Sequence, residues 1–250
     1  MKSSKKYYKY IDIIRLLACV SVLLYHLNIL KGGYLAVCTF FVLSGYLSCV
    51  SAFRKDKFSL SKYYINRALK LYLPLVIVTF ISISAVSFFP KIVLLNLKPE
   101  TNSILLGYNN FWQLNANMDY FARQANSPFI HFWYIAILLQ FDLIFPFIFM
   151  FLRKIGDKFG KLIPCIITFI LSIISVIYFY KVSSGSNIMV TYYNTFSRLF
   201  SLLFGVMLGF IHNYYGSLIP KALKNNITNK VIFYLYLSIL ILLFIFIDFN

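Results

Sequence analysis

The sequence is poor in charged residues. Of its 250 residues only 12% are charged, while 60% are hydrophobic and the mean hydropathy is +0.77. Ordinary soluble domains carry roughly 25% charged residues. The shortage of charge therefore excludes an ordinary soluble domain and indicates an integral membrane protein.

Cysteine is also scarce, and its placement argues against two classes of site. The sequence has four cysteines, and all of them fall inside apolar runs without the spacing of metal ligands: Cys19, Cys38, Cys49 and Cys165. Neither a disulfide framework nor a zinc site is supported by this pattern. We interpret the thiols as small buried hydrophobic groups, and we expect no metal.

Long apolar runs are abundant. A helix needs about 20 mostly apolar residues to cross a bilayer, and seven runs approach that length: Tyr10–Leu30, Ala36–Phe53, Leu71–Phe89, His131–Leu152, Leu162–Tyr180, Tyr193–His212 and Val231–Asp248. They are apolar all round, whereas barrel strands alternate polar and apolar residues. With no repeat or flexible linker visible, the sequence predicts an all-α, multi-pass transmembrane helix bundle of about seven spans. Residues 1–250 form one integral-membrane domain in this interpretation.

The net charge of +17 raises the question of nucleic-acid binding. With the N-terminus inside the cell, most of the 24 Lys and Arg residues fall in cytoplasmic segments, as the positive-inside rule requires. We therefore expect a cytoplasmic N-terminus, the cell membrane as location, a lipid bilayer as partner and no nucleic acid. A cleaved signal peptide is the alternative for the first run, but that run is rather long and no small-x-small cleavage site follows it.

The first run carries two ionisable residues, Arg15 and His26, within the stretch IDIIRLLACVSVLLYHLNI. At about 100° per residue they lie on one helix face, about 16 Å apart along the axis. Ionisable residues inside spans usually face a bundle interior or a watery cavity. We therefore expect both side chains to share one inward-facing cavity. Alternatively, Arg15 snorkels or pairs with Asp12, and His26 is an interfacial hydrogen-bonding residue.

Further blocks follow this run in order. They are a Gly-Gly pair with FFVLSG at residues 32–45, KYYINRALKLYLP at 62–74, HFWYIAILLQFDLIFP at 131–146 and RLFSLLFGVMLG at 198–209. Together with the Arg15 and His26 spacing, they resemble the acyltransferase-3 family, bacterial integral-membrane O-acyltransferases of surface polysaccharides and related glycans. The chain departs from the family pattern at Cys38, where Asp is usual, and at Leu138, where many members have Glu. It also has fewer predicted spans than members of that family.

The resemblance implies transfer of an acyl group, expected to be acetyl, from cytoplasmic acyl-CoA to a hydroxyl of a cell-surface or lipid-linked polysaccharide. A base must take the hydroxyl proton, and histidine titrates near neutrality. We therefore expect His26 to be the general base or a transient acyl carrier. Arg15 is expected to stabilise the negative charge that develops during the reaction.

The basic residues Arg67 and Lys70 are expected to hold the CoA phosphates. Their alternative role is that of ordinary positive-inside charges. Further candidates, expected along the substrate path, are Phe41, Ser44, Gly45 and Trp133. The leading alternative for Ser44 and Gly45 is close helix packing through small residues. For Trp133 the alternative is a place in the interfacial aromatic belt.

His131 and Arg198 have weaker claims to the site, whereas His212 and Asp142 are interpreted as interfacial or structural residues. Two other functions stay open on the sequence, because a polysaccharide exporter or flippase also needs polar groups within the membrane. One is such an exporter component, and the other is an inactive accessory subunit. Other envelope-biosynthesis proteins are candidate partners.

Overall fold

The computed structural model describes residues 9–54, 58–88, 97–115, 129–185, 188–216 and 226–246, and within these ranges the chain contains helices and no strand. The N-terminal helices are α1 (Lys9–His26), η1 (Lys31–Leu35), α2 (Ala36–Phe53), α3 (Leu60–Arg67), the π segment η2 (Ala68–Tyr72) and α4 (Leu73–Ser87). Then come α5 (Leu97–Leu105), α6 (Asn109–Asn115), η3 (Ile130–Phe132), α8 (Trp133–Phe159), α9 (Ile163–Ser183), α10 (Ile188–Tyr193), α11 (Thr195–Tyr215) and α12 (Asn226–Phe246).

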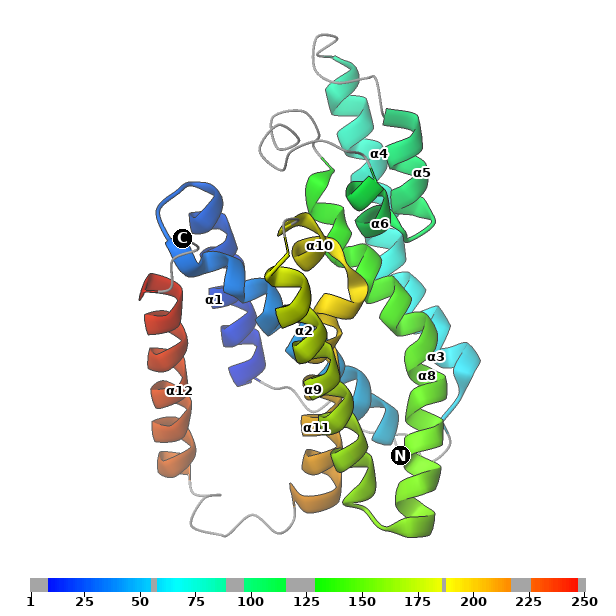
Figure 1. The fold of residues 1–250 in the computed structure, drawn as a ribbon, viewed down its shortest axis with the longest axis vertical. Helices are drawn as coiled ribbons and strands as arrows, with labels where there is room; N and C mark the ends of the chain where they lie inside the picture. Colours follow the sequence, from blue (N-terminus) through cyan, green and yellow to red (C-terminus); the bar gives the residue numbers. More distant parts are fainter. Residues whose placement is uncertain are drawn as a thin grey trace.

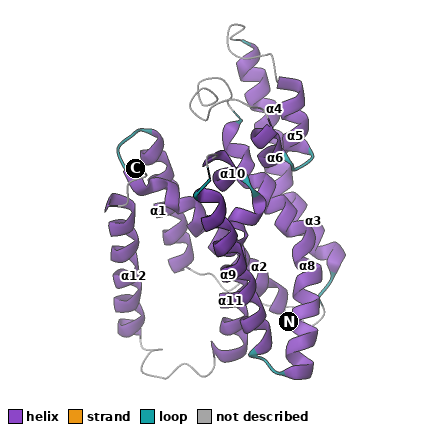
Figure 2. Ribbon diagram, viewed as in Figure 1, coloured by secondary structure: helices purple, strands orange, loops and turns teal. Residues whose placement is uncertain are grey.

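Long helices run alternately in opposite directions (Figures 1 and 2). Helix α11 packs against both α2 and α9, and α8 contacts α2, α3 and α9. Helix α12 lies against α1 and η1, where Leu240 and Phe244 pack on Ala18 and Ala36. The end of α1 and the beginnings of α2, α8 and α11 consequently lie at one end of the bundle.

Five helical segments of the described chain are long and apolar enough to cross a membrane: Lys31–Phe53, Leu60–Ser87, Ile130–Phe159, Ile163–Ser183 and Met189–Tyr215. The all-helical, multi-pass character is thus confirmed. Helices α1 and α12 coincide with the other two predicted spans. However, α1 carries Lys9, Asp12 and Arg15, and the apolar part of α12, Phe233–Ile245, is short. The count of seven stays a prediction.

The third predicted span, Leu71–Phe89, was wrong at its start. One continuous helical segment runs from Leu60 to Ser87, so that Arg67 lies inside it instead of in a preceding loop. The Ser59 hydroxyl caps this helix by accepting a hydrogen bond from the Lys62 amide at 3.5 Å. A basic residue does not by itself end a helix, so the helix continues through Arg67. Only the tertiary structure shows that the Arg67 charge is paired.

The segment before α8 contains the short helices α5 and α6. Buried amides attach α6 to the bundle. The Asn110 amide donates to the Thr195 hydroxyl at 2.9 Å, and the Gln140 amide donates to the Asn110 carbonyl oxygen at 2.8 Å.

The contact between α2 and α11 is the closest helix crossing in this part of the fold. A Cβ at Gly45 would overlap the carbonyl oxygen of Leu202, and one at Gly205 would overlap the carbonyl oxygen of Val42. The two backbones can approach this closely only because glycine occupies both positions. Aromatic rings fill the core beside this crossing, including the fully buried Phe41.

Candidate active site

The turn between α1 and α2 determines where His26 lies. Helix α1 ends at His26, and Asn28 adopts a left-handed conformation with a φ of 56°, which reverses the chain direction. The chain then crosses back over α1 at Gly33, where a Cβ would overlap the carbonyl oxygen of Ser21. The Gly-Gly pair of the sequence therefore permits a close backbone crossing just below His26.

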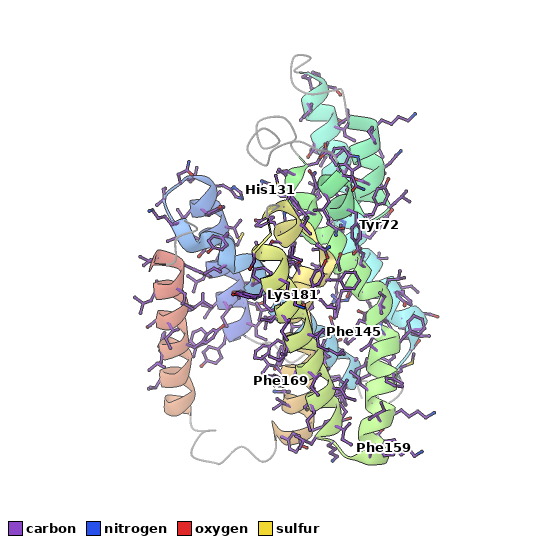
Figure 3. The ribbon with its side chains drawn as sticks, viewed as in Figure 1. Tyr72, His131, Phe145, Phe159, Phe169 and Lys181 are labelled. Carbon is purple, nitrogen blue, oxygen red and sulfur yellow. The ribbon has the colours of Figure 1, made fainter. Side chains whose placement is uncertain are left out.

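His26 meets a second histidine. Its ring lies edge-to-face against that of His131, with 4.5 Å between the ring centroids. Figure 3 shows His131 at the end of α8 opposite Phe159. Both imidazoles are exposed on the described chain, and neither is packed into the core. An exposed imidazole keeps a nitrogen accessible to a reacting hydroxyl, as a general base requires.

The first turn of α8 gathers several of the candidate residues. His131 contacts His26, and Trp133, two residues further on, lies 6.3 Å from the ring of Phe41. The ring of Tyr134 is closer to Phe41, at 4.6 Å, and the Ser44 side chain is hydrogen-bonded to its phenol. Residues predicted on three separate sequence blocks thus converge on one turn of helix.

Arg15 and His26 have different immediate neighbours. The Arg15 guanidinium lies 3.3 Å from an Asp12 carboxylate oxygen, and both side chains are about half exposed. The ion pair with Asp12 is the alternative that the sequence offered for Arg15.

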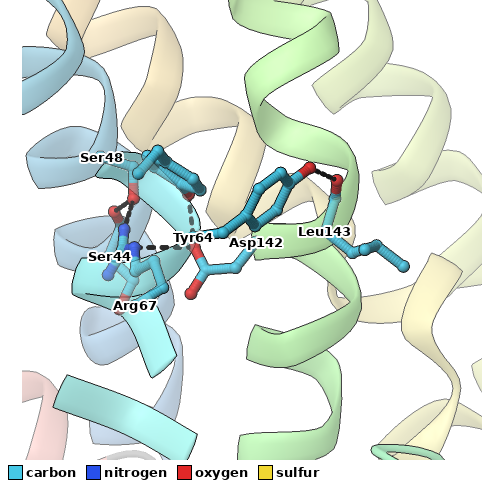
Figure 4. Close-up of polar contacts among 7 residues, drawn as sticks. Ser44, Ser48, Tyr64, Arg67, Asp142 and Leu143 are labelled. Carbon is cyan, nitrogen blue, oxygen red and sulfur yellow. Dashed lines mark hydrogen bonds and ion pairs between the residues drawn. The ribbon is translucent and has the colours of Figure 1, made fainter. Parts of the chain in front are cut away.

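Arg67 belongs to a buried polar network (Figure 4). Its Nε lies 3.1 Å from Asp142 Oδ1, and the Tyr63 hydroxyl donates to the same oxygen at 2.8 Å. Its Nη2 donates to the hydroxyl of Ser48, which in turn donates to the carbonyl oxygen of Ser44 at 2.6 Å. The network joins α2, α3 and α8 within the bundle. Asp142, which the sequence indicated as structural or interfacial, is the carboxylate that neutralises Arg67.

The remaining candidates differ in their surroundings. Lys70 is exposed on the π segment, and Ser44 is half-buried beside Tyr134. Gly45 lies in the contact with α11, the position that close helix packing predicts. Among the described residues, no group of three or more His, Cys, Asp or Glu side chains is arranged to hold a metal ion.

Sequence reasoning gave too little weight to His131 and did not single out Tyr134. Both stand in the block HFWY at residues 131–134, next to the Trp133 that was selected. A polar residue beside a selected aromatic is a weak signal by itself. Only the packing of α8 against α1 and α2 reveals what the two side chains contact.

Comparison with protein families supplies the decisive observation. The model of the family described as "Acyltransferase domain" matches residues 8–250, nearly the whole chain. The chain belongs to this family. The match confirms the resemblance drawn from the sequence blocks, all of which lie within the matched residues.

Curated relatives point the same way. The chain is 32% identical over 240 residues to the O-acetyltransferase OatA of Staphylococcus aureus strain NCTC 8325, covering 92% of this chain and 38% of the relative. It is 32% identical over 235 residues to the peptidoglycan O-acetyltransferase OatA of Listeria monocytogenes strain EGD-e, covering 88% and 37%. The chain therefore spans less than two fifths of the length of these relatives. No solved structure matches it.

Proposed function

We propose that this chain is a membrane O-acyltransferase that moves an acetyl group from acetyl-CoA to a hydroxyl of a cell-surface or lipid-linked glycan. The observation that carries the proposal is the pairing of His26 with His131 at the turn where Trp133 and Tyr134 meet Phe41 and Ser44. The names of the relatives, one of which acts on peptidoglycan, support the reaction class and a glycan acceptor.

His26 acts as the general base. An imidazole nitrogen takes the proton of the acceptor hydroxyl as its oxygen attacks the thioester carbonyl. The new carbon–oxygen bond forms, the carbon–sulfur bond breaks, and coenzyme A leaves as a thiol after taking a proton. The edge-to-face contact with His131 restricts the orientation of the base, because an exposed side chain would otherwise sample several rotamers.

Arg15 cannot stabilise charge at the atoms that His26 touches, because 11 residues of helix put the two about 16 Å apart along the axis. We place it on the donor side, together with Lys70. Lys70 is the more accessible cation for CoA phosphates, since Arg67 already binds Asp142 and Ser48.

In this arrangement the N-terminus and the donor are cytoplasmic, the protein lies in the cell membrane, and the acceptor is reached at the histidine end. Other envelope-biosynthesis proteins are candidate partners.

The test is acetyl transfer by the full chain purified into lipid. Radiolabelled acetyl-CoA is supplied with a glycan acceptor, and label in the glycan is measured. His26→Ala is expected to lower the rate by about 100-fold to 10,000-fold, the usual contribution of a general base. His212→Ala is the matched control, because that imidazole is also exposed but lies at the other end of the bundle, on the last turns of α11.

The outcomes separate the proposed enzyme from the two other functions. Transfer that depends on His26 and not on His212 supports the enzyme. Wild-type protein that moves unmodified glycan across the vesicle membrane without labelling it would replace the enzyme by an exporter. No transfer and no transport by well-folded protein would instead indicate an accessory subunit.

A further inference from the structure

A cavity of about 280 Å³ lies among the helices, with Tyr34 and Arg198 in its wall. It is lined by residues from five elements, among them Tyr34, Cys38, Phe179, Thr191, Tyr192 and Arg198. Half of its lining residues are aromatic, and Arg198 is the one cation among them. Nothing in the proposed transfer step uses this space.

Arg198 is a buried cation whose charge is not neutralised by a carboxylate in the described part of the chain. The residue is only 8% exposed. Its Nε donates to the carbonyl oxygen of Tyr192 at 3.0 Å, and its Nη1 lies 3.8 Å from the Cys38 sulfur. Two of its five N–H groups are thereby engaged, and neither partner carries a negative charge.

Aromatic rings compensate for part of the cost of burying this charge. The guanidinium carbon lies 4.9 Å from the centroid of Tyr192 and 5.8 Å from those of Trp133 and Phe179. Such contacts stabilise a cation by roughly 0.5–2 kcal/mol. Removing a charge from water costs several kcal/mol, so the rings alone do not balance it. An anion entering the cavity would complete the compensation.

A second polar group lines the same cavity without a partner. The Thr191 hydroxyl is buried and makes no hydrogen bond in the structure. Buried hydroxyls normally have partners, because leaving one unsatisfied costs about 1–3 kcal/mol. The cavity therefore offers a guanidinium with unused N–H groups and a hydroxyl, both suited to an oxyanion.

The cavity is connected to His26 by adjoining rings. Tyr34, in its wall, lies 5.7 Å from Tyr25, whose ring lies 5.4 Å from that of His26. On the other side, Trp133 contacts Arg198 and follows His131 by two residues. Two ring contacts thus separate His26 from the cavity wall at Tyr34.

We propose that this cavity binds the anionic group, a carboxylate or a phosphate, of a charged saccharide acceptor. A guanidinium can pair with such a group through two parallel hydrogen bonds, and the aromatic walls offer surfaces for a sugar ring. The assignment to the acceptor rests on the proposed function. The anion preference itself rests only on the cavity.

The test is binding to the full chain in lipid nanodiscs. Two matched probe pairs distinguish the sources of the anion: N-acetylmuramic acid with its primary amide, and N-acetylglucosamine 1-phosphate with N-acetylglucosamine. The wild-type chain is expected to bind at least one charged probe about tenfold more tightly than its neutral twin, which corresponds to about 1.4 kcal/mol. The pair that shows the preference identifies the carboxylate or the phosphate.

Variants then test the assignment to Arg198. Arg198→Gln is expected to abolish the preference, and Arg198→Lys to keep only part of it, because an ammonium lacks the planar fork. Lys181→Gln, an exposed charge on α9, is the control and should leave the preference intact. If Arg198→Gln does not fold, Thr191→Val is a milder change. It should weaken binding of the charged probe about threefold.

Three results would overturn the inference: equal binding of the charged and neutral twins by the wild-type chain, a preference that stays undiminished in Arg198→Gln or, if that variant does not fold, in Thr191→Val, or displacement of the charged probe from the cavity by coenzyme A. The last would assign the cavity to the donor. Because these are binding measurements, they are independent of the transfer assay. Loss of the His26 effect would remove the proposed enzyme without touching the anion preference.

Discussion

Two regions of this protein collect ionisable side chains, and they treat them in opposite ways. Around Arg67 and Asp142, opposite charges are paired inside the bundle and joined to the hydroxyls of Tyr63 and Ser48, so that three helices are connected. At the histidine end, His26 and His131 are exposed and contact mainly each other. The comparison indicates that the charges inside the bundle hold helices together, whereas the exposed imidazoles keep a nitrogen accessible for proton transfer.

The strongest test of this comparison removes the carboxylate of the buried pair. Asp142→Ala leaves Arg67 and the Tyr63 hydroxyl without their common partner, and the loss of one member of a buried pair typically costs about 3–5 kcal/mol. We expect a fall of about that size in the free energy of unfolding, measured by denaturant titration in detergent micelles. Asp157→Ala, an exposed position on the same helix, should change it by less than about 0.5 kcal/mol. Equal effects of the two would mean that the network does not hold the helices.

A second change targets the helix crossing beside this network. Gly45→Ala places a methyl group on the backbone of α11, so the two helices must separate, at a cost of about 1–3 kcal/mol. The thermal unfolding midpoint of the detergent-solubilised chain reports the loss. Gly216→Ala is the control, since a Cβ there meets no atom within 4 Å. Unchanged stability in Gly45→Ala would show that α2 and α11 are not in tight contact.

A third change tests whether His131 orients His26. His131→Gln removes the ring that orients His26 but leaves the base itself. We expect kcat to fall about tenfold, equivalent to about 1.4 kcal/mol in the barrier, while KM and the thermal midpoint stay unchanged. Acetyl-transfer kinetics across a range of acceptor concentrations separate kcat from KM. A large loss of thermal stability would instead make His131 a structural residue.

The smallest effect is expected at the exposed ion pair of α1. Asp12→Asn removes the partner of Arg15, but exposed pairs contribute only about 0–1 kcal/mol. The unfolding midpoint should therefore move little, in contrast to Asp142→Ala. A shift as large as that of Asp142→Ala would erase the distinction between the two regions.

The predicted helices and the observed ones agree best where apolar runs end at a turn. The run Ala36–Phe53 coincides with α2 at both ends, because a Gly-Gly turn precedes it and Arg54 follows it. The run beginning at Leu71 does not coincide with the start of its helix. Hydropathy places the start of the helix after the last charged residue, but Arg67 is charged and lies inside the helix, where it is paired within the bundle. Hydropathy records the polarity of a residue and carries no information about its partner.

The sequence by itself determined the class of protein and its family, because apolar length, basic residues and ordered motifs are local properties of the chain. It also favoured close packing at Gly45, which the structure places in the contact with α11. Only the tertiary structure joined His26 to His131, Arg67 to Asp142, and Arg198 to a ring-lined cavity. These partners are more than 70 residues apart or come from several helices. Contacts of that kind depend on how helices pack, which no local pattern encodes.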